Sequence, residues 1–283
     1  MMRTALVTLV AGAVLAASAG CGIRIEKYEF SDDHVVDEKY TTVKVRGGDH
    51  DGHSGDVTIR YQQGLTETKI HRRVEHRKNN KPSGVQHRVE GDVLVLDGCG
   101  DDCEINYEVL VPDAAVAVQG ETGSGDAVFE GLAAVDYRTG SGDITVRDVK
   151  GDVRATSGSG NFAAGRIDGG VTVEVGSGNL VLDLIKGKSM LVTHSGDIVG
   201  TGIGNDIVAD ASSGNVSLTL LSERPVRANS GSGDINLRIP GGPFRIIGES
   251  GSGERMINVP TDPVAKTELK LNTGSGDIRV VGI

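Results

Sequence analysis

A short sequence pattern recurs along this chain at a nearly constant interval, and it constrains the fold more than any other feature. The pattern is Gly-Ser-Gly or Ser-Gly followed by one residue, which we call the marker. The markers are Asp126, Asp143, Asn161, Asn179, Asp197, Asn215, Asp234, Glu254 and Asp277. Successive markers are 17, 18, 18, 18, 18, 19, 20 and 23 residues apart. A fixed short period predicts a solenoid, in which each repeat stacks on the one before it.

The residues after each marker predict the structure of one repeat. After Asp143, apolar or small residues stand 1, 3, 6, 10 and 12 positions later, and the same positions are apolar or small after Asn161 and Asp197. Pairs of apolar residues two apart are typical of strands with one buried face. Two short strands and two turns account for each repeat of about 18 residues. The sequence therefore predicts an all-β fold, a single-stranded parallel β-helix, with a right-handed coil favoured.

The corner at each marker has a predictable chemistry. Glycine permits the positive φ angles of a sharp corner, and an Asp or Asn side chain can accept hydrogen bonds from turn amides. Coils stacked roughly 4.8 Å apart would align equivalent residues in ladders. We therefore expect a continuous apolar core inside the coils and a turn ladder of markers along one corner.

The first 20 residues resemble a secretory signal. A single Arg precedes an Ala-, Leu- and Val-rich run that ends in small residues before Cys21. Such a run is too short and too rich in Ala to predict a membrane span. Ala-Gly-Cys21 resembles a bacterial lipobox, in which the chain is cut before the Cys and that Cys carries lipid, although Ser18 stands where such boxes usually have Leu. The sequence predicts a signal peptide over 1–20, a lipidated Cys and tether or cap over 21–40, and attachment to a membrane outside the cytoplasm. Ordinary secretion after an Ala-x-Ala-like cut is the alternative.

The other two cysteines, Cys99 and Cys103, flank a loop rich in Gly and Asp. If Cys21 is lipidated, these two form an even pair in an oxidising compartment, which predicts a disulfide. A loop this small gains little entropy from closure, so the bond would fix a hairpin tip. A redox or metal-binding dithiol is the alternative, but the spacing is wider than the two-residue gap of such sites.

Residues 41–120 are less regular than the repeats at 121–283. Asp56 occupies a marker-like position, and 28–42 could cover the open end of the first coils, since a bare edge invites aggregation. A basic stretch from Lys69 to Lys81 could contact anionic headgroups or wall polymers, although interleaved Glu residues favour a mixed-charge strand. The net charge of −10 argues against nucleic acid as a partner.

The lipoprotein start, Val111-Pro112-Asp113 before the first Gly-Ser-Gly-Asp, and the Ser-Gly-Asp-Ile-x-Val coils together resemble a known family. This is the bacterial β-strand-repeat "putative adhesin" family of unknown function, and the resemblance covers about 40–283. It implies a surface module and carries no catalytic residues.

Two kinds of site remain as alternatives to a structural role. The marker row could bind calcium as a β-roll does, but the period is about 18, not nine, and Asn161, Asn179 and Asn215 interrupt the acidic row. The cluster at 49–53, Asp-His-Asp-Gly-His, could ligate zinc or copper but lacks further ligands. A polysaccharide-active enzyme is more remote, because Trp is absent and no Ser-His-Asp set is visible. We expect a non-enzymatic, adhesin-like surface module without a cofactor, with an envelope polymer or surface protein as partner.

Overall fold

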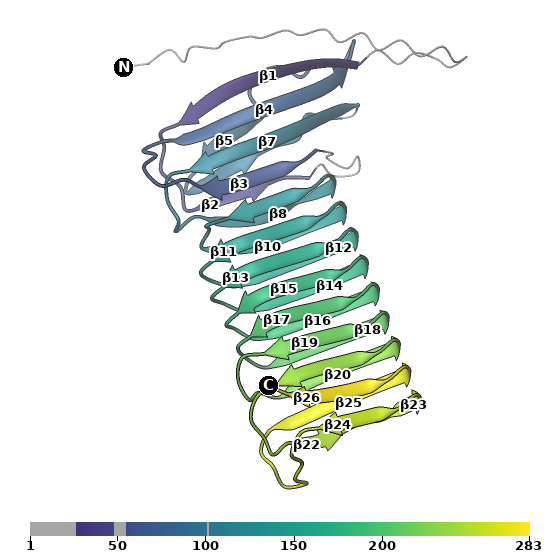
Figure 1. Ribbon diagram of the computed structural model, residues 1–283. Coiled ribbons are helices and arrows are strands. Elements are labelled where there is room, and N and C mark those ends of the chain that lie inside the picture. Colours follow the sequence, from purple (N-terminus) through teal and green to yellow (C-terminus); the bar gives the residue numbers. More distant parts are fainter. Residues whose placement is uncertain (1–26, 48–54, 101) are drawn as a thin grey trace, which may run out of the picture. The chain divides into compact units, whose positions relative to one another are not determined.

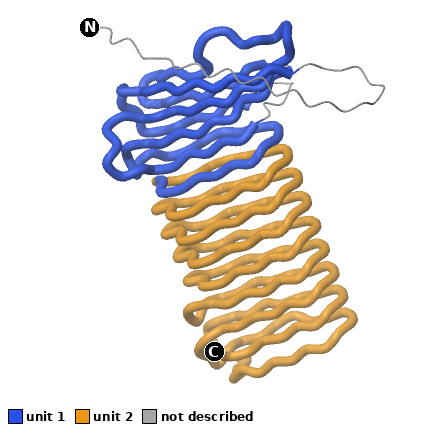
Figure 2. The backbone as a smooth tube through the Cα atoms, turned by 45° about the horizontal axis from the view of Figure 1, so that its top comes forward, with its two compact units in different colours: residues 1–132 blue, residues 133–283 orange. Residues whose placement is uncertain are grey.

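The computed structural model describes residues 27–47, 55–100 and 102–283, and every regular element in these ranges is a β-strand (Figure 1). Within the same ranges, no helix has the length and apolarity needed to cross a membrane. The chain divides into two compact units, residues 1–132 and residues 133–283 (Figure 2). The sequence places the change from irregular to regular structure slightly earlier, at residue 121.

The first unit contains two sheets of mixed direction. Its strands are β1 (Lys27–Val36), β2 (Thr42–Val45), β3 (Val57–Tyr61), β4 (Thr68–Arg77), β5 (His87–Glu90), β6 (Val93–Leu96), β7 (Cys103–Val111), β8 (Ala117–Ser124) and β9 (Ala127–Glu130). One sheet has the order β1-β4-β7-β3-β9 and the other β8-β2-β6-β5. The pairs β1–β4, β4–β7 and β5–β6 are antiparallel. Residues 27–36 thus form the outermost strand of the first sheet.

The second unit is the parallel β-solenoid that the repeats predict. Its strands are β10 (Ala134–Ser141), β11 (Ile144–Val149), β12 (Val153–Ser159), β13 (Phe162–Ile167), β14 (Val171–Ser177), β15 (Leu180–Ile185), β16 (Ser189–Ser195), β17 (Ile198–Ile203), β18 (Ile207–Ser213), β19 (Val216–Leu220), β20 (Val226–Ser232), β21 (Ile235–Ile239), β22 (Arg245–Ile247), β23 (Ser250–Ser252), β24 (Arg255–Asn258), β25 (Glu268–Ser275) and β26 (Ile278–Gly282). Each coil gives one strand to each of two sheets. Neighbouring strands pair with an offset of one repeat, as in the column Val146, Ala164 and Leu182.

The core of this unit consists of the inward columns predicted from the offsets. After Asp143, the five inward residues are at most 4% exposed. The side chains between them, such as Arg147 and Arg154, point to solvent. Burial alternates with a period of two along each strand, so each coil buries one face against the interior of the stack.

The last coils stack in an order that differs from their order in the chain. Strands β25 and β26, at the C-terminus, lie between β20 and β21 on one side and β22, β23 and β24 on the other (Figure 1). The marker Asp277 therefore follows Asp234 in the stack, and Glu254 comes last. The strand β26 is therefore paired on both edges, with β21 and with β24.

Candidate functional site

The turn ladder is a continuous chain of hydrogen bonds that runs along the corner of the second unit. The Oδ1 atom of Asp143 accepts the backbone N–H of Asn161 at 2.7 Å, and Oδ1 of Asn161 accepts that of Asn179 at 3.0 Å. The same bond recurs at each later step, with N···O distances of 2.7 to 2.9 Å, up to the bond from Glu254 to Asp277. Because only a short side chain can place its oxygen under the next amide, the ladder explains why every marker except Glu254, the last in the stack, is Asp or Asn.

Asn markers also provide donors to the carboxylates beside them. The Asn161 Nδ2 atom donates to both carboxylate oxygens of Asp143, at 3.2 and 3.4 Å, and Asn215 Nδ2 donates to Asp197 at 3.2 Å. An amide between carboxylates replaces the repulsion of stacked like charges with a hydrogen bond. Asn at these positions therefore supports stacking.

The first unit has its own short ladder. Asp56 Oδ1 accepts the N–H of Asp126 at 2.8 Å, which places Asp56 in the marker role that the sequence indicates. Asn106 Oδ1 accepts the N–H of Asp56 at 2.6 Å. Asn106 lacks the repeat pattern that would predict this role, because no Gly-Ser-Gly precedes it and it lies within β7.

The ladder geometry favours a structural role over cation binding. At each step in the second unit, one side-chain oxygen already accepts a backbone N–H. Among the residues that the structure describes, no three His, Cys, Asp or Glu side chains gather closely enough to hold a metal ion. Calcium requires six to eight oxygen ligands, and a row with one engaged oxygen per coil does not converge them.

The last coil in the stack departs from the repeat chemistry. Its marker is Glu254, which has a longer side chain than Asp or Asn. Because this coil is the last in the stack, its marker does not have to accept the backbone N–H of a next coil. Arg255 takes the column that holds Ile235 and Ile278 in the neighbouring coils, and it is exposed. An inward-pointing charge on an edge strand discourages pairing with another sheet. The side chains of this coil thus disfavour the pairing of another strand at the exposed edge.

A surface hollow of about 520 Å³ lies in the second unit, along the turn of each coil that carries no marker. One wall is a column of left-handed residues, Asp148, Arg166 and Leu184 with φ of 55° to 56° and Gly202 with φ of 70°. Arg166 donates to both oxygens of Asp148, at 2.5 and 2.6 Å, and this hydrogen bonding holds the pKa of Asp148 below its usual value. The exposed side chains of Leu184 and Leu221 give the hollow an apolar part.

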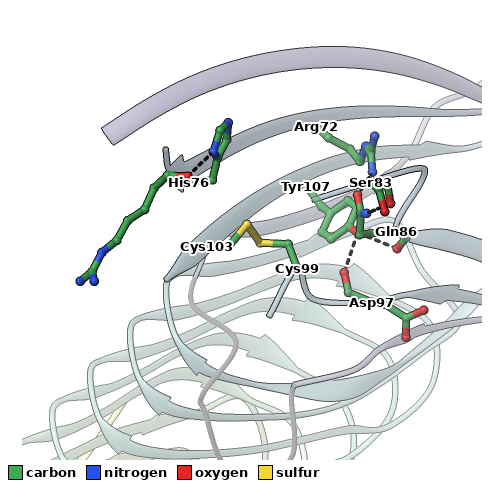
Figure 3. The surroundings of a disulfide bond; sticks show 9 residues. Arg72, His76, Ser83, Gln86, Asp97, Cys99, Cys103 and Tyr107 are labelled. Atoms are coloured by element: carbon green, nitrogen blue, oxygen red, sulfur yellow. Dashed lines mark hydrogen bonds between the residues drawn. A yellow bond between two sulfur atoms is a disulfide. The ribbon is translucent and has the colours of Figure 1, made fainter. Parts of the chain in front are cut away.

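A disulfide joins Cys99 to Cys103 in the first unit (Figure 3). Cys103 begins β7, and Cys99 follows β6 in the loop that leads to it. Nearby, the hydroxyl of Tyr107 donates to the backbone oxygens of Gln86 and Asp97, at 2.8 and 2.7 Å (Figure 3). The predicted disulfide is confirmed, and it fixes the start of β7 to the loop before it.

A buried ion pair lies in the same unit. Arg72 is 1% exposed and donates from Nε to Asp32 at 2.7 Å and from Nη1 to Gln86 at 2.5 Å. Burial raises the pKa of Asp32, but hydrogen bonds and charge from Arg72 outweigh that effect, so the pKa lies below its usual value. The buried Arg72 side chain therefore links Asp32 of β1 to Gln86 in the loop before β5.

Two histidines lie beside this pair. The rings of His34 and His87 are 4.8 Å apart, and His34 Nε2 is 3.1 Å from Asp32 Oδ1 without the alignment of a hydrogen bond. Burial, with the nearby His34 and Arg72, lowers the pKa of His87 to about 4. His87 is thus neutral at neutral pH. The sequence pattern indicated neither histidine, and it placed Arg72 only within the basic stretch.

The basic stretch of β4 is a mixed-charge surface. Arg73 pairs with Glu29 at 3.9 Å and Arg77 with Asp102 at 2.9 Å, while Glu75 of the same strand pairs with Lys27 at 3.2 Å. The stretch thus carries both signs of charge, and acidic partners from outside it neutralise part of its basic charge. Cys21 and the cluster at 49–53 lie outside the described residues.

Comparison with known proteins gives the chain a family. The profile of the Toastrack DUF4097 family matches residues 101–281. Similar solved structures include a "putative adhesin" from Bacteroides fragilis NCTC 9343 (15% identity, TM-score 0.45, covering 92% of this chain and 100% of that chain). Others are a "putative adhesin" from Parabacteroides distasonis ATCC 8503 (14%, 0.29, 90% and 94%) and a "putative cell adhesion protein" from Clostridium sporogenes ATCC 15579 (10%, 0.22, 89% and 100%). No functionally curated protein matches the chain. Because the family profile spans more than half of its 283 residues, the chain belongs to the Toastrack DUF4097 family.

Proposed function

We propose that this chain is a lipid-anchored, extracytoplasmic β-solenoid that acts as a non-enzymatic, adhesin-like surface module. The observation that carries the proposal is the use of the cysteines. The chain has three, and Cys99 and Cys103 are joined to each other. The remaining one, Cys21, follows Ala-Gly at the end of a signal-like segment, where a lipoprotein carries its lipid. Disulfides persist in oxidising compartments, which agrees with a chain exported before it is anchored.

The chemistry of the turn ladder supports a non-enzymatic role. Acid–base and nucleophilic catalysis need groups that face a substrate. The marker oxygens of the second unit instead accept backbone N–H groups from the next coil. The outward columns of the strands carry the variable side chains, so they are the surface available for an envelope polymer or a surface protein.

Metabolic labelling with an alkyne fatty acid in a bacterial host tests the anchor. The wild-type chain should take up label and partition into detergent, and Cys21→Ser should do neither. The matched control is the double variant Cys99→Ser/Cys103→Ser, which loses the disulfide and should still be labelled. An unlabelled wild-type chain, or label retained by Cys21→Ser, would contradict the proposal.

A further inference from the structure

A shallow groove of about 390 Å³ crosses the outer face of one sheet in the second unit. It spans strands β17, β19, β21 and β26, which are neighbours in that sheet. Its outward polar side chains are Thr201, Ser217, Thr219, Asn236, Arg238 and Arg279. The groove therefore runs in the stacking direction and offers a hydroxyl, amide or guanidinium group at every strand.

Among the described residues, the two arginines in the groove have no acidic partner. Both are exposed, and within the described part of the chain neither lies within ion-pair distance of a carboxylate. Arg238 is flanked across the strands by Thr219 and Val281, and Arg279 by Asn236 and Met256. The Arg279 guanidinium makes a weak hydrogen bond, 3.7 Å long, to Met256 Sδ.

The groove places two cations together on a chain in which acidic residues outnumber basic ones by 39 to 29. Some Arg residues on the sheets have an acidic cross-strand partner: Arg245 pairs with Glu268, and Arg60 pairs with Glu130. Others do not, since Arg227 lies between Val208 and Lys270. Arg238 and Arg279 likewise gain no ion pair from the described part of the protein, and two neighbouring cations repel each other. Such a pair is suited to an external anion.

We propose that this groove binds an acidic polysaccharide, with Arg238 and Arg279 holding carboxylate groups and the Thr, Ser and Asn side chains binding sugar hydroxyls. The inference rests on the proposed function, because it names the class of envelope polymer that the surface module recognises. A guanidinium group matches a carboxylate in two parallel hydrogen bonds. The strands repeat at roughly 4.8 Å, so each successive sugar meets a new row of polar groups.

The composition of the groove favours a polysaccharide over other polyanions. A protein interface is centred on buried aromatic or Arg anchors in pockets, and this face is shallow with no aromatic side chain among its lining residues. An anionic membrane is recognised by clusters of about four to eight basic residues, and this groove has two. The hydroxyl and amide side chains around two cations instead fit a chain of hydroxyls and carboxylates, and the outward Val199 and Val281 offer apolar contact to the faces of the sugar rings.

The test is the binding of the purified full chain to fluorescein-labelled polygalacturonate oligomers, followed by fluorescence anisotropy at low and raised salt. We expect binding that weakens with salt, and no binding to neutral dextran. The double variant Arg238→Gln/Arg279→Gln should bind at least about tenfold more weakly, because both charge-assisted contacts are lost. Arg227→Gln is the matched control, since it removes an exposed, outward Arg from β20 on the other sheet, and its affinity should stay within about twofold of wild type.

A further variant separates sugar recognition from simple charge attraction. Thr219→Val removes one hydroxyl at nearly constant shape and should weaken polygalacturonate binding without changing the binding of poly-glutamate. Circular dichroism checks that all variants fold, which is expected because the replaced side chains point to solvent.

Three results would overturn the proposal. They are no binding of polygalacturonate by the wild-type chain, equal loss in Arg227→Gln and in the double variant, and tighter Arg-dependent binding to poly-glutamate or to phosphatidylglycerol vesicles. Lipid labelling at Cys21 is measured separately in cells. A failure of the groove is therefore distinguishable from a failure of the anchor.

Discussion

Replacing Gly178 with alanine should destabilise the second unit about as much as truncating a large apolar side chain in its core. Gly178 forms the corner between β14 and β15 with a φ of 150°. A Cβ atom built there would lie closer than 3.0 Å to the backbone oxygen and carbon of Gly160 in the adjacent coil. The carbonyl group of Gly160 cannot move aside, because it belongs to a backbone that is hydrogen-bonded to coils on both sides.

The expected magnitude follows from two costs. A non-glycine residue in this conformation costs about 1–3 kcal/mol, and displacing a packed neighbour costs about 1–3 kcal/mol more. We therefore expect a loss of about 2–6 kcal/mol, a large fraction of the roughly 5–15 kcal/mol that holds a typical domain folded. Urea unfolding followed by far-ultraviolet circular dichroism measures the loss as a lower midpoint.

The matched control is Gly165→Ala. Gly165 lies on β13, its φ is not positive, and no atom stands within 4 Å of a Cβ built there. Alanine at this position should leave stability unchanged or raise it by about 0.4–1 kcal/mol, because the unfolded chain loses freedom. Equal midpoints for the two variants would refute the reasoning that the corner glycine is required by the approach of adjacent coils.

Three further predictions concern acid, the end of the stack and calcium. The pKa of His87 falls from 6.5 to about 4 on folding, so the unfolded chain binds a proton more readily than the folded one. The neutral His87 therefore contributes fully to the free energy of unfolding above pH 6.5, and this contribution is lost as the pH falls to about 4. We expect a loss of about 1–2 kcal/mol, reduced by partial exposure, and His87→Gln should flatten the pH dependence in urea titrations. The double variant Glu254→Asp/Arg255→Ile restores the repeat at the terminal edge and should self-associate with rising concentration in light scattering, where the single variant Glu254→Asp should stay as wild type. Thermal melts in chelator and in millimolar calcium should coincide, and a stabilisation by calcium would make the turn ladder a binding site.

Much of the second unit could be predicted because its period fixes both conformation and register. Once Val146 is placed inside, the repeat places Ala164 and Leu182 in the same column, and the structure pairs them so. The corner chemistry was predictable for the same reason, since Gly and a short polar side chain recur together. A repeated environment provides several independent observations of one physical requirement.

Stacking order and buried charge were harder to predict. Repeat spacing shows that two coils are alike but not which neighbour each one takes, and so the insertion of Asp277 between Asp234 and Glu254 was missed. Arg72 was grouped with its basic neighbours as a surface residue. The alternation along β4 could have located it, because Ile70, Arg72 and Val74 share the inward side and are all buried.

The solenoid separates the residues that maintain the fold from those that can recognise a partner. Inward columns are constrained by dry packing, and markers by the amide of the next coil, so substitution in either disturbs more than one coil. Neither constraint acts on the outward columns, so their side chains can change without loss of stacking. An outward column can therefore carry side chains that serve recognition. Arg238 and Arg279 lie together with hydroxyl and amide groups in one groove, which is why we place recognition on this face and not at the acidic corner.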